Sequence, residues 1–435
     1  MAQVDPQDEA VELCRDLIRF ASVNDGTGRG KGEREAAEYV AGKLAEVGLA
    51  PELFESAPNR ASVVARVEGE DRSRPALLIH GHLDVVPAEP KVWTYDPFAG
   101  EIADGMLWGR GAVDMLDMDA MTLAVVRDRL RTGRKPARDV VLAFVADEEA
   151  GGVFGAQWLV QHQPALFEGC TEASGEVGGF SLSVDDDLRL YLIETAQKGM
   201  AWMRLTAGGT SGHGSMINSD NAVTRLCEAV SRLGAHEFPV HVTATVRAFL
   251  DEVSGAFGIE LDPDDLSTTV ATLGPLARIV GATLRNTANP TMLDAGYKHN
   301  VVPGTASAMV DGRYLPGFED AWEREIDEVL GPDIVREYTH YDIALETEFE
   351  GALVDAMAGA LKAEDPGARA VPYMLSGGTD AKSFSRLGMR CFGFSPLRLP
   401  PDLDFSGMFH GVDERVPLES LKFGVRVLDH FLDRA

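Results

Sequence analysis

Apolar residues recur along this chain with two spacings, which predict helices alternating with short strands. Residues 11–18 and 36–47 have the three- and four-residue spacing of a helical face, and the second stretch ends at Gly48, a typical helix C-cap. The run Ser62–Val67 is rich in β-branched residues and predicts a strand. This alternation is typical of an α/β sheet.

The apolar run Ala76–Ile79 predicts a buried parallel strand that delivers polar side chains at its carboxyl end. His82 and Asp84 follow directly, within the motif His-Gly-His-Leu-Asp. Open α/β sheets bind ligands at this end of their strands. Imidazole and carboxylate together suit a divalent metal such as zinc. Taken alone, the pair could equally be a loop histidine in a structural ion pair.

A second apolar run, Val140–Ala146, ends in the acids Asp147, Glu148 and Glu149. Two strands of one parallel sheet would bring these acids close to His82. Adjacent residues at a strand-to-helix turn point to different sides, so one carboxylate could bind metal while its neighbour holds a water, as metal-assisted hydrolysis requires. The alternative is a solvated first turn of a helix.

Two further candidates gain weight from the order of motifs. Glu176 lies in GEVGGF and His410 in MFHGVDERVP; singly, each could be a loop acid or a surface histidine. The ordered set HGHLD, GRGAVDM, DEEAGG, GEVGGF and FHGVDE is highly specific. GRGAVD itself lacks the G-x-G-x-x-G spacing of a dinucleotide site.

With these motifs the chain resembles, over nearly its whole length, the zinc-dependent aminoacylase and carboxypeptidase family. That group includes glutamate carboxypeptidase, acetylornithine deacetylase, succinyl-diaminopimelate desuccinylase and carnosinase. The resemblance implies an α/β fold in which helices flank a mixed, mainly parallel sheet. It also implies an inserted, smaller α+β domain that serves as a lid and for dimerisation.

The resemblance also assigns roles to the first group of motif residues. It implies that His82 binds metal, that Asp84 orients this histidine, and that Asp114 of the Gly-Arg-Gly-Ala-x-Asp-Met motif bridges two metals. Glu176 matches the second ligand of the metal that His82 binds. The implied cofactors are two divalent metal ions, most simply Zn²⁺, with Co²⁺ or Mn²⁺ as alternatives.

The paired glutamates divide their roles in the same family. By resemblance, Glu148 is the general base and Glu149 a ligand, which His410 joins on the second metal. The base would take a proton from a water that the metals acidify, and would return it to the leaving amine.

One departure from the family pattern follows Asp114. The family usually carries a lysine and often two glycines after the Asp-Met pair, whereas this chain has Leu116, Asp117 and Met118. The change removes a positive charge near a carboxylate-rich site, so it bears on metal affinity and rate.

The pattern changes near Lys198, where a strand, a helix from about Asn221, a further strand and a further helix follow one another. This order suggests an α+β insertion in residues 198–348 between two parts of a catalytic domain, residues 1–197 and 349–435. The resemblance implies that the insertion is the lid and dimerisation domain. The stretch 238–288 fits this plan least, and its acidic tract at 262–265 predicts a surface loop.

His213 lies in the Gly-His-Gly-Ser motif of this insertion. In the family the lid histidine reaches a substrate carbonyl, commonly in the active site of the partner subunit of a homodimer. We therefore expect His213 to stabilise the oxyanion. The alternative is a capping or loop histidine before a helix.

The resemblance places further residues near a substrate with a free carboxylate. They are Asn300 in HNVVPG, Arg313 in DGRYLPG, and Gly377, Gly378 and Thr379 in LSGGTDA. A guanidinium is a natural bidentate receptor for a carboxylate, although Arg313 could instead form a structural ion pair. Gly-Gly turns are also commonly structural.

Composition narrows the class of protein. At 435 residues the chain exceeds what one hydrophobic core usually holds, which predicts two domains. Its 69 acidic and 40 basic residues give a formal net charge of −29, which opposes nucleic-acid and anionic-membrane partners. The four cysteines have no CxxC spacing, the first residues lack the features of a signal peptide, and no apolar run reaches the ~20 residues of a membrane span. We therefore expect a cytoplasmic protein.

These observations predict a metal-dependent hydrolase that cleaves the amide bond of a dipeptide, a peptide C-terminus or an N-acyl amino acid. The context of Glu176 and the long insertion favour a carboxypeptidase or dipeptidase. An N-acyl-amino-acid amidohydrolase of the deacetylase or desuccinylase type is the enzymatic alternative. An inactive metal-binding dimer is the other, but such a protein would have no need of Glu148.

Overall fold

The computed structural model describes residues 4–258, 260, 262, 266, 270 and 276–435, and its chain forms two compact units. The first unit comprises Met1–Thr195, Thr347–Tyr373 and Thr379–Ala435; the second comprises Ala196–Glu346 and Met374–Gly378. The boundaries expected after residues 197 and 348 lie near these bounds. The roles expected of the two domains stay predictions.

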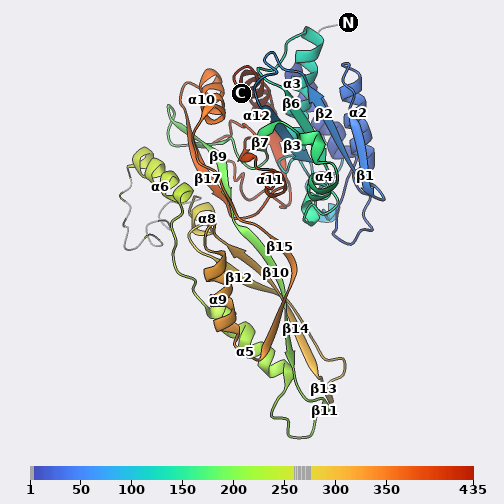
Figure 1. Cartoon of the computed structure of the whole chain (residues 1–435), viewed down its shortest axis with the longest axis vertical. Helices are drawn as coiled ribbons and strands as arrows, with labels where there is room; N and C mark the ends of the chain where they lie inside the picture. Colours follow the sequence, from blue (N-terminus) through green and yellow to red (C-terminus); the bar gives the residue numbers. More distant parts are fainter. Residues whose placement is uncertain (1–3, 259, 261, 263–265, 267–269, 271–275) are drawn as a thin grey trace. The chain divides into compact units, whose positions relative to one another are not determined.

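The first unit contains a mixed sheet with a parallel centre (Figure 1). In spatial order its strands are β1 (Glu52–Ala57), β2 (Arg60–Val67), β6 (Val140–Val145), β3 (Ala76–His82), β7 (Cys170–Gly175), β18 (Arg390–Gly393) and β9 (Arg189–Gln197). Strands β6, β3, β7 and β18 run parallel, and β1, β2 and β9 pair antiparallel to their neighbours. Strands β8 (Phe180–Ser183) and β17 (Ala368–Leu375) also pair with β9. This is the predicted α/β sheet.

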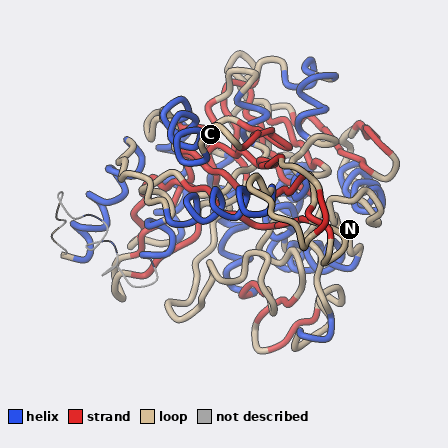
Figure 2. Tube along the Cα trace, turned by 90° about the horizontal axis from the view of Figure 1, so that it is seen from below, coloured by secondary structure: helices blue, strands red, loops and turns tan. Residues whose placement is uncertain are grey.

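Helices cover both faces of this sheet. Figure 2 draws the helices of the whole chain in blue and its strands in red. His80 and Gly81 are neighbours in β3, so their side-chain positions face opposite sides. The His80 ring packs on Phe384 with ring centroids 4.8 Å apart, whereas a Cβ at Gly81 would meet Asp119. The helices are α1 (Pro6–Arg19), α2 (Arg34–Ala45), α3 (Leu116–Thr132), α4 (Ala156–His162), α10 (Ala352–Glu364), α11 (Ala381–Ser385) and α12 (Leu418–Leu432). Coverage from both sides explains why every residue of β3 is buried.

Helix α1 illustrates how the local sequence specifies an element. The Asp5 side chain accepts a hydrogen bond of 2.9 Å from the amide of Gln7, and Pro6 occupies the first turn. The apolar positions predicted from the spacing, among them Val11 and Leu17, are buried. The cap and the apolar face together define this helix.

Short elements complete the first unit. A small antiparallel sheet joins β4 (Glu101–Ala103), β5 (Met106–Trp108) and β19 (Arg415–Pro417). Single turns of 3₁₀ helix lie at η1 (Pro90–Val92), η2 (Glu148–Ala150) and η3 (Pro164–Phe167). Because β5 pairs with β19, the segment before Asp114 lies beside the segment after His410.

The second unit is an antiparallel sheet with helices on one face (Figure 1). The sheet has the order β12 (Thr287–Ala295), β14 (Thr305–Tyr314), β10 (Gly199–Gly208) and β15 (Ile334–Asp342). Alternate residues of β10 are buried against Trp322 of α9 (Glu319–Leu330) and against α5 (Ala222–Ala235). Elements β11 (Gly212–His213) and β13 (Val301–Val302) form a separate pair, and β16 (Leu345–Glu346) pairs with the end of β9. The α+β character predicted for the insertion is present.

In the stretch that could not be assigned from sequence, the described residues include the helices α6 (Ala244–Phe257) and α8 (Leu276–Gly281). The acidic tract expected to form a surface loop falls almost wholly outside the described residues. Among the helices of the described residues, none combines the length and the apolar composition that a bilayer-spanning segment requires.

Candidate metal centre

The candidate ligands lie where three neighbouring parallel strands end. His82 is the last residue of β3, Glu149 lies in the turn η2 that follows β6, and Glu176 follows β7 directly. Parallel strands present their carboxyl ends at one edge of a sheet, so these side chains meet there. Asp114 and His410 reach the same place from loops. The structure thus brings together all five predicted ligands.

Asp114 is shared between two groups of ligands. Its Oδ1 lies 3.3 Å from Nε2 of His82, and that nitrogen is 3.5 Å from Oε2 of Glu176. Its Oδ2 lies 3.2 Å from Nε2 of His410, and that nitrogen is 3.0 Å from Oε2 of Glu149. Within each group the potential ligand atoms all lie within 4.8 Å of one another. One carboxylate therefore faces two sites with its two oxygens.

Burial and neighbouring charges shift the pKa values of the groups in this cluster. Burial, aided by the charge of Asp114, raises the pKa of Glu149 to about 7, and burial also raises the pKa of Glu176. Burial alone would raise the pKa of Asp114, but its contacts with His410 and His82 hold it below the usual range. Hydrogen bonds to Asp114 and Glu149 raise the pKa of His410 to about 10. The cluster therefore favours added positive charge.

The residues present fit divalent metal ions. Each group offers one imidazole nitrogen and carboxylate oxygens, which is a donor set for zinc and similar metals. The buried Oε1 of Glu149 has no hydrogen-bond partner among the described residues. The Nδ1 atom of His82 lies 2.9 Å from the backbone oxygen of Asp84. Donation to that oxygen fixes the tautomer that leaves Nε2 facing the ligands.

The carboxylate of Asp84 holds the turn that carries the paired glutamates. It accepts hydrogen bonds of 3.1 Å from the backbone amides of both Glu148 and Glu149, and its Oδ1 is 3.6 Å from Nδ1 of His82. Burial, and then the charge of Glu176, raise the pKa of Glu148 well above its usual range. A carboxylate of raised basicity therefore lies next to the candidate ligands.

Arg110 and Glu414 are supporting residues that the sequence reasoning missed. The buried Glu414 accepts hydrogen bonds from the amides of Val113 and Asp114, at 2.8 and 3.2 Å, and pairs with Arg110 at 2.6 Å. Arg110 also donates to the backbone oxygen of His410 at 3.3 Å. Both residues lie inside motifs that signalled the site, Gly-Arg-Gly and FHGVDE, and that was the available signal.

His213 and Asn300 lie together in the second unit. His213 is exposed in β11 opposite Val301, and its Nδ1 lies 2.8 Å from Oγ of Ser215. The backbone oxygen of Asn300 accepts a hydrogen bond of 2.9 Å from Gly214. The pair β11 and β13 therefore presents both predicted residues at one end of this unit.

The remaining predicted substrate residues are placed differently. Arg313 lies near the carboxyl end of β14. Its Nε and Nη2 donate hydrogen bonds of 2.6 and 3.1 Å to the carboxylate of Asp311. This is the structural ion pair of the alternative interpretation. Gly377 and Gly378 follow β17, and Oγ1 of the buried Thr379 accepts a hydrogen bond of 3.2 Å from Ala381 at the start of α11. This hydrogen bond of Thr379 stabilises the start of α11.

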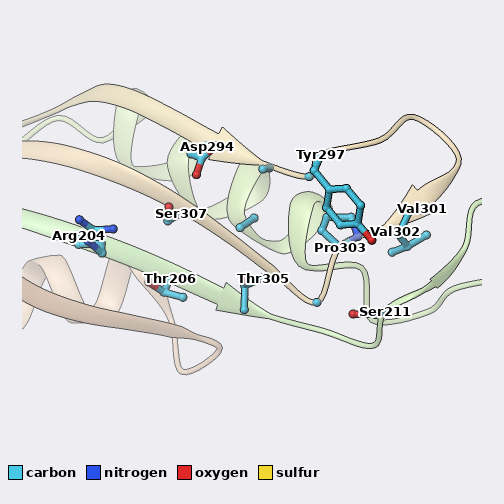
Figure 3. Close-up of a pocket in the computed structure, with 14 residues that line it drawn as sticks. Arg204, Thr206, Ser211, Asp294, Tyr297, Val301, Val302, Pro303, Thr305 and Ser307 are labelled. Atoms are coloured by element: carbon cyan, nitrogen blue, oxygen red, sulfur yellow. The ribbon is translucent and has the colours of Figure 1, made fainter.

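A pocket of about 440 Å³ lies beside the His213 strand pair. Figure 3 shows Arg204 on β10 and Asp294 on β12 at one end of it, and Tyr297 at the other. Ser211, which precedes β11, and Val301, which begins β13, also line the pocket. Within the part of the chain that the structure describes, neither Arg204 nor Asp294 forms an ion pair, and both residues are exposed.

Residues 78–434 match the model of Peptidase family M20/M25/M40. The chain belongs to this family. The resemblance inferred from the motifs is thereby confirmed. The prediction of a hydrolase that acts on amide bonds is confirmed with it.

Individual relatives agree with this assignment. The chain is 28% identical to N-fatty-acyl-amino acid synthase/hydrolase PM20D1 of Xenopus tropicalis, covering 96% of this chain and 84% of the relative. It is 25% identical to mouse aminoacylase-1, covering 98% and 96%. Its fold is similar to that of the M20 family metallo-carboxypeptidase Sso-CP2 from Sulfolobus solfataricus, with a TM-score of 0.72, 17% identity and coverage of 98% and 99%. The predicted α/β fold class is confirmed.

The segment that departs from the family pattern buries two acids on α3. Asp117 and Asp119 are each 2% exposed, and one carboxylate oxygen of each has no hydrogen-bond partner among the described residues. Burial raises the pKa of Asp117 to about 8, with smaller contributions from the charges of Glu414 and Asp114. Leu116 is buried beside them and supplies no charge to offset these carboxyls.

We predict that Asp117→Asn stabilises the metal-free protein at alkaline pH. The folded-state pKa of about 8 lies above the unfolded-state value of ~3.9, so stability is lost as pH rises through this interval. Asparagine has no such proton to lose, and one pKa unit corresponds to ~1.4 kcal/mol. Urea unfolding should therefore show a gain for the variant that grows between pH 5 and pH 8. A difference that does not change with pH would contradict this assignment.

Proposed function

We propose that this chain is a metal-dependent hydrolase that cleaves an amide bond next to a free carboxylate. The observation that carries the proposal is the division of Asp114 between His82 and His410, with Glu148 in the adjoining turn. Two sites that share a carboxylate, beside a base of raised pKa, suit hydrolysis by an activated water. A site built only for binding would not need this base.

We propose two divalent ions, zinc most simply, as the cofactors. The first would be held by His82, Asp114 and Glu176, and the second by Asp114, Glu149 and His410. When bound, such ions polarise a carbonyl group and acidify a water molecule. The matching donor sets support the proposal, and the raised pKa of Glu149 is what a carboxylate without its cation would have.

The chain's own residues supply the proton transfers. Glu148 accepts the proton of the attacking water and afterwards gives it to the leaving amine. Its basicity follows from burial and from the negative charge of Glu176. Asp84 keeps the Glu148 backbone in place through the 3.1 Å hydrogen bond, so the base is held on a fixed turn. His213 would donate to the oxyanion that develops on the carbonyl.

Two acyl classes remain as candidates for the substrate. Carboxypeptidase or dipeptidase activity agrees with the metallo-carboxypeptidase among the similar structures. N-acyl-amino-acid amidohydrolysis is supported by the aminoacylase-1 relative. Both require recognition of a carboxylate, for which we propose Asn300, Arg313, Gly377, Gly378 and Thr379. Arg313 would exchange its contact with Asp311 for the substrate. The pocket beside His213 would hold the part of the substrate remote from the bond that breaks.

We also propose that the second unit is a lid and forms a homodimer. Its end near His213 exposes apolar side chains, since Met216 is 70% and Ile217 103% exposed. A cluster of exposed apolar residues around a predicted catalytic group is typical of a surface that another chain covers. This supports action of His213 in the partner's site.

A cytoplasmic location completes the proposal. The acidic composition opposes association with anionic surfaces. All four cysteines are free, which suits a reducing compartment.

Elemental analysis tests the cofactors. Protein purified without chelator should contain about two divalent metals per chain, because two donor groups share one carboxylate. Asp114→Asn should lose metal from both sites, whereas Asp117→Asn, three positions along the chain, should retain it. Zero metal in the unaltered protein, even after zinc or cobalt is added, would overturn the proposal.

The paired glutamates can be separated by substitution. Glu148→Gln keeps size and hydrogen bonding but cannot take a proton, so kcat should fall by ~10²–10⁴ while metal content stays unchanged. Glu149→Gln should instead lose metal. Full activity of Glu148→Gln, or loss of its metal, would show that base and ligand are assigned in the wrong order.

His213→Ala should lower kcat by ~10²–10³ with metal content unchanged, if His213 donates to the oxyanion. Mixing this inactive chain with the inactive Glu148→Gln chain should restore activity, because one site of the mixed dimer then has both groups. Subunit exchange is verified separately with a size tag on one chain. Exchange without recovered activity would exclude action across the dimer.

A further inference from the structure

Asn24 is a buried asparagine that joins the two strand ends bearing the candidate catalytic turn. The segment around it runs alongside the residues that follow β3: the amide of Asn24 donates to the oxygen of Val85 at 2.9 Å, and the amide of Val85 donates to Ser22 at 3.1 Å. Asn24 is 2% exposed. Its side chain is therefore held between the ends of β3 and β6 without access to solvent.

The amide nitrogen of Asn24 contacts two carboxylates at once. Its Nδ2 donates to Oδ2 of Asp84 at 2.8 Å and to Oδ1 of Asp147 at 3.0 Å. These acids are buried, with 0% and 3% exposure. Asp84 lies two positions after His82, and Asp147 directly precedes Glu148. Two like charges in this position repel, and the amide is the donor that lies between them.

Arg60 fixes which way the amide of Asn24 points. Its Nη2 donates to Oδ1 of Asn24 at 2.7 Å, and the backbone amide of Gly26 donates to the same oxygen at 3.1 Å. Arginine has donors only and carboxylates have acceptors only, so a single orientation of the amide satisfies all four contacts. Arg60 is itself anchored by Glu33, which is fully buried.

Asp84 and Asp147 hold the 3₁₀ turn η2 in place. Asp84 accepts from the backbone amides of Glu148 and Glu149, as described above. Asp147 has a left-handed φ of 70°, a conformation that is uncommon outside glycine, asparagine and aspartate. Its Oδ2 accepts a hydrogen bond of 2.9 Å from the amide of Phe154. The position of the base therefore depends on two carboxylates that share one amide.

We propose that Asn24 is a positioning residue for hydrolysis, which clamps Asp84 to Asp147 and so fixes the turn of Glu148 and Glu149. Arg60 serves the clamp by orienting its amide, and its Nη1 also lies 3.9 Å from Oδ1 of Asp147. Without the amide the two buried carboxylates lose a shared donor and repel each other, so the turn loosens. Neither Asn24 nor Arg60 belongs to the two candidate ligand groups, so the effect reaches the reaction through Asp84 and Asp147.

Hydrogen–deuterium exchange of the metal-free protein tests the clamp directly. Asn24→Ala should speed exchange of the Glu148 and Glu149 amides by about tenfold or more, because their acceptor Asp84 is no longer held. Asn286→Ala is the matched control: Asn286 is also buried, and its Oδ1 accepts a 2.8 Å hydrogen bond from Leu315 in the second unit. It should leave these two amides unchanged. Unchanged exchange in folded Asn24→Ala would overturn the proposal.

Kinetics of the metal-loaded enzyme test the consequence for turnover, and this arm rests on the proposed function. Changes at residues that orient metal ligands and bases typically cost ~10–100-fold, so Asn24→Ala should lower kcat by this amount with KM within about twofold. Asn24→Ser, which keeps one donor, should recover part of kcat, and Arg60→Lys, which cannot serve both Asn24 and Glu33, should lie between. These two variants carry the test if Asn24→Ala does not fold.

The two arms separate the possible failures. Faster amide exchange together with inactive wild-type protein would refute the proposed function and retain the clamp. Wild-type kcat in all three folded variants would refute the positioning role. A third outcome is a loss of kcat in Asn24→Ala that Asn24→Ser does not recover, with thermal stability lowered as much as in Asn286→Ala. This outcome would show that Asn24 has only a structural role.

Discussion

Buried carboxylates are concentrated at one edge of the sheet in the first unit, and most of the contacts around that edge offset their negative charge. Asp84, Asp114, Asp147, Glu149 and Glu176 all lie at or beside the ends of β3, β6 and β7. Buried carboxylates are costly unless they are hydrogen-bonded or paired with cations. The fold therefore supplies backbone amides, an asparagine amide, two histidines and an arginine ion pair around them. Divalent metal ions would supply the remaining positive charge.

The parallel centre of the sheet is what makes this concentration of charge possible. Parallel neighbours end on the same side, so acids that are far apart in the sequence meet without long side chains or special loops. Each acid then needs only a short connection to its strand, as Glu176 has to β7 and Glu149 to β6. The loops with Asp114 and His410 depend on the β5 and β19 pairing and on Arg110.

The sequence predicted the parts of the site that local patterns encode. Apolar runs that end in polar residues located His82 and Glu149, and the ordered motifs with the family resemblance located Asp114, Glu176 and His410. The supporting contacts were not predictable in this way. Glu414 reaches Asp114 across 300 positions of sequence, and Asn24 reaches Asp147 across 123. Such pairs are set by the packing of whole elements, for which a single sequence contains no periodic signal. The helices α6 and α8 were likewise missed, because loop-like composition surrounds them.

The shared carboxylate of Asp114 has a consequence for the energetics of occupancy. Because Oδ1 and Oδ2 belong to one planar group, a rotation that improves the contact of one oxygen also displaces the other. The affinities of the two proposed ion sites would therefore be thermodynamically linked, and any factor by which the first ion changed the binding of the second would act equally in reverse. The steepness of a metal titration would therefore report the sign and size of the coupling between the two sites.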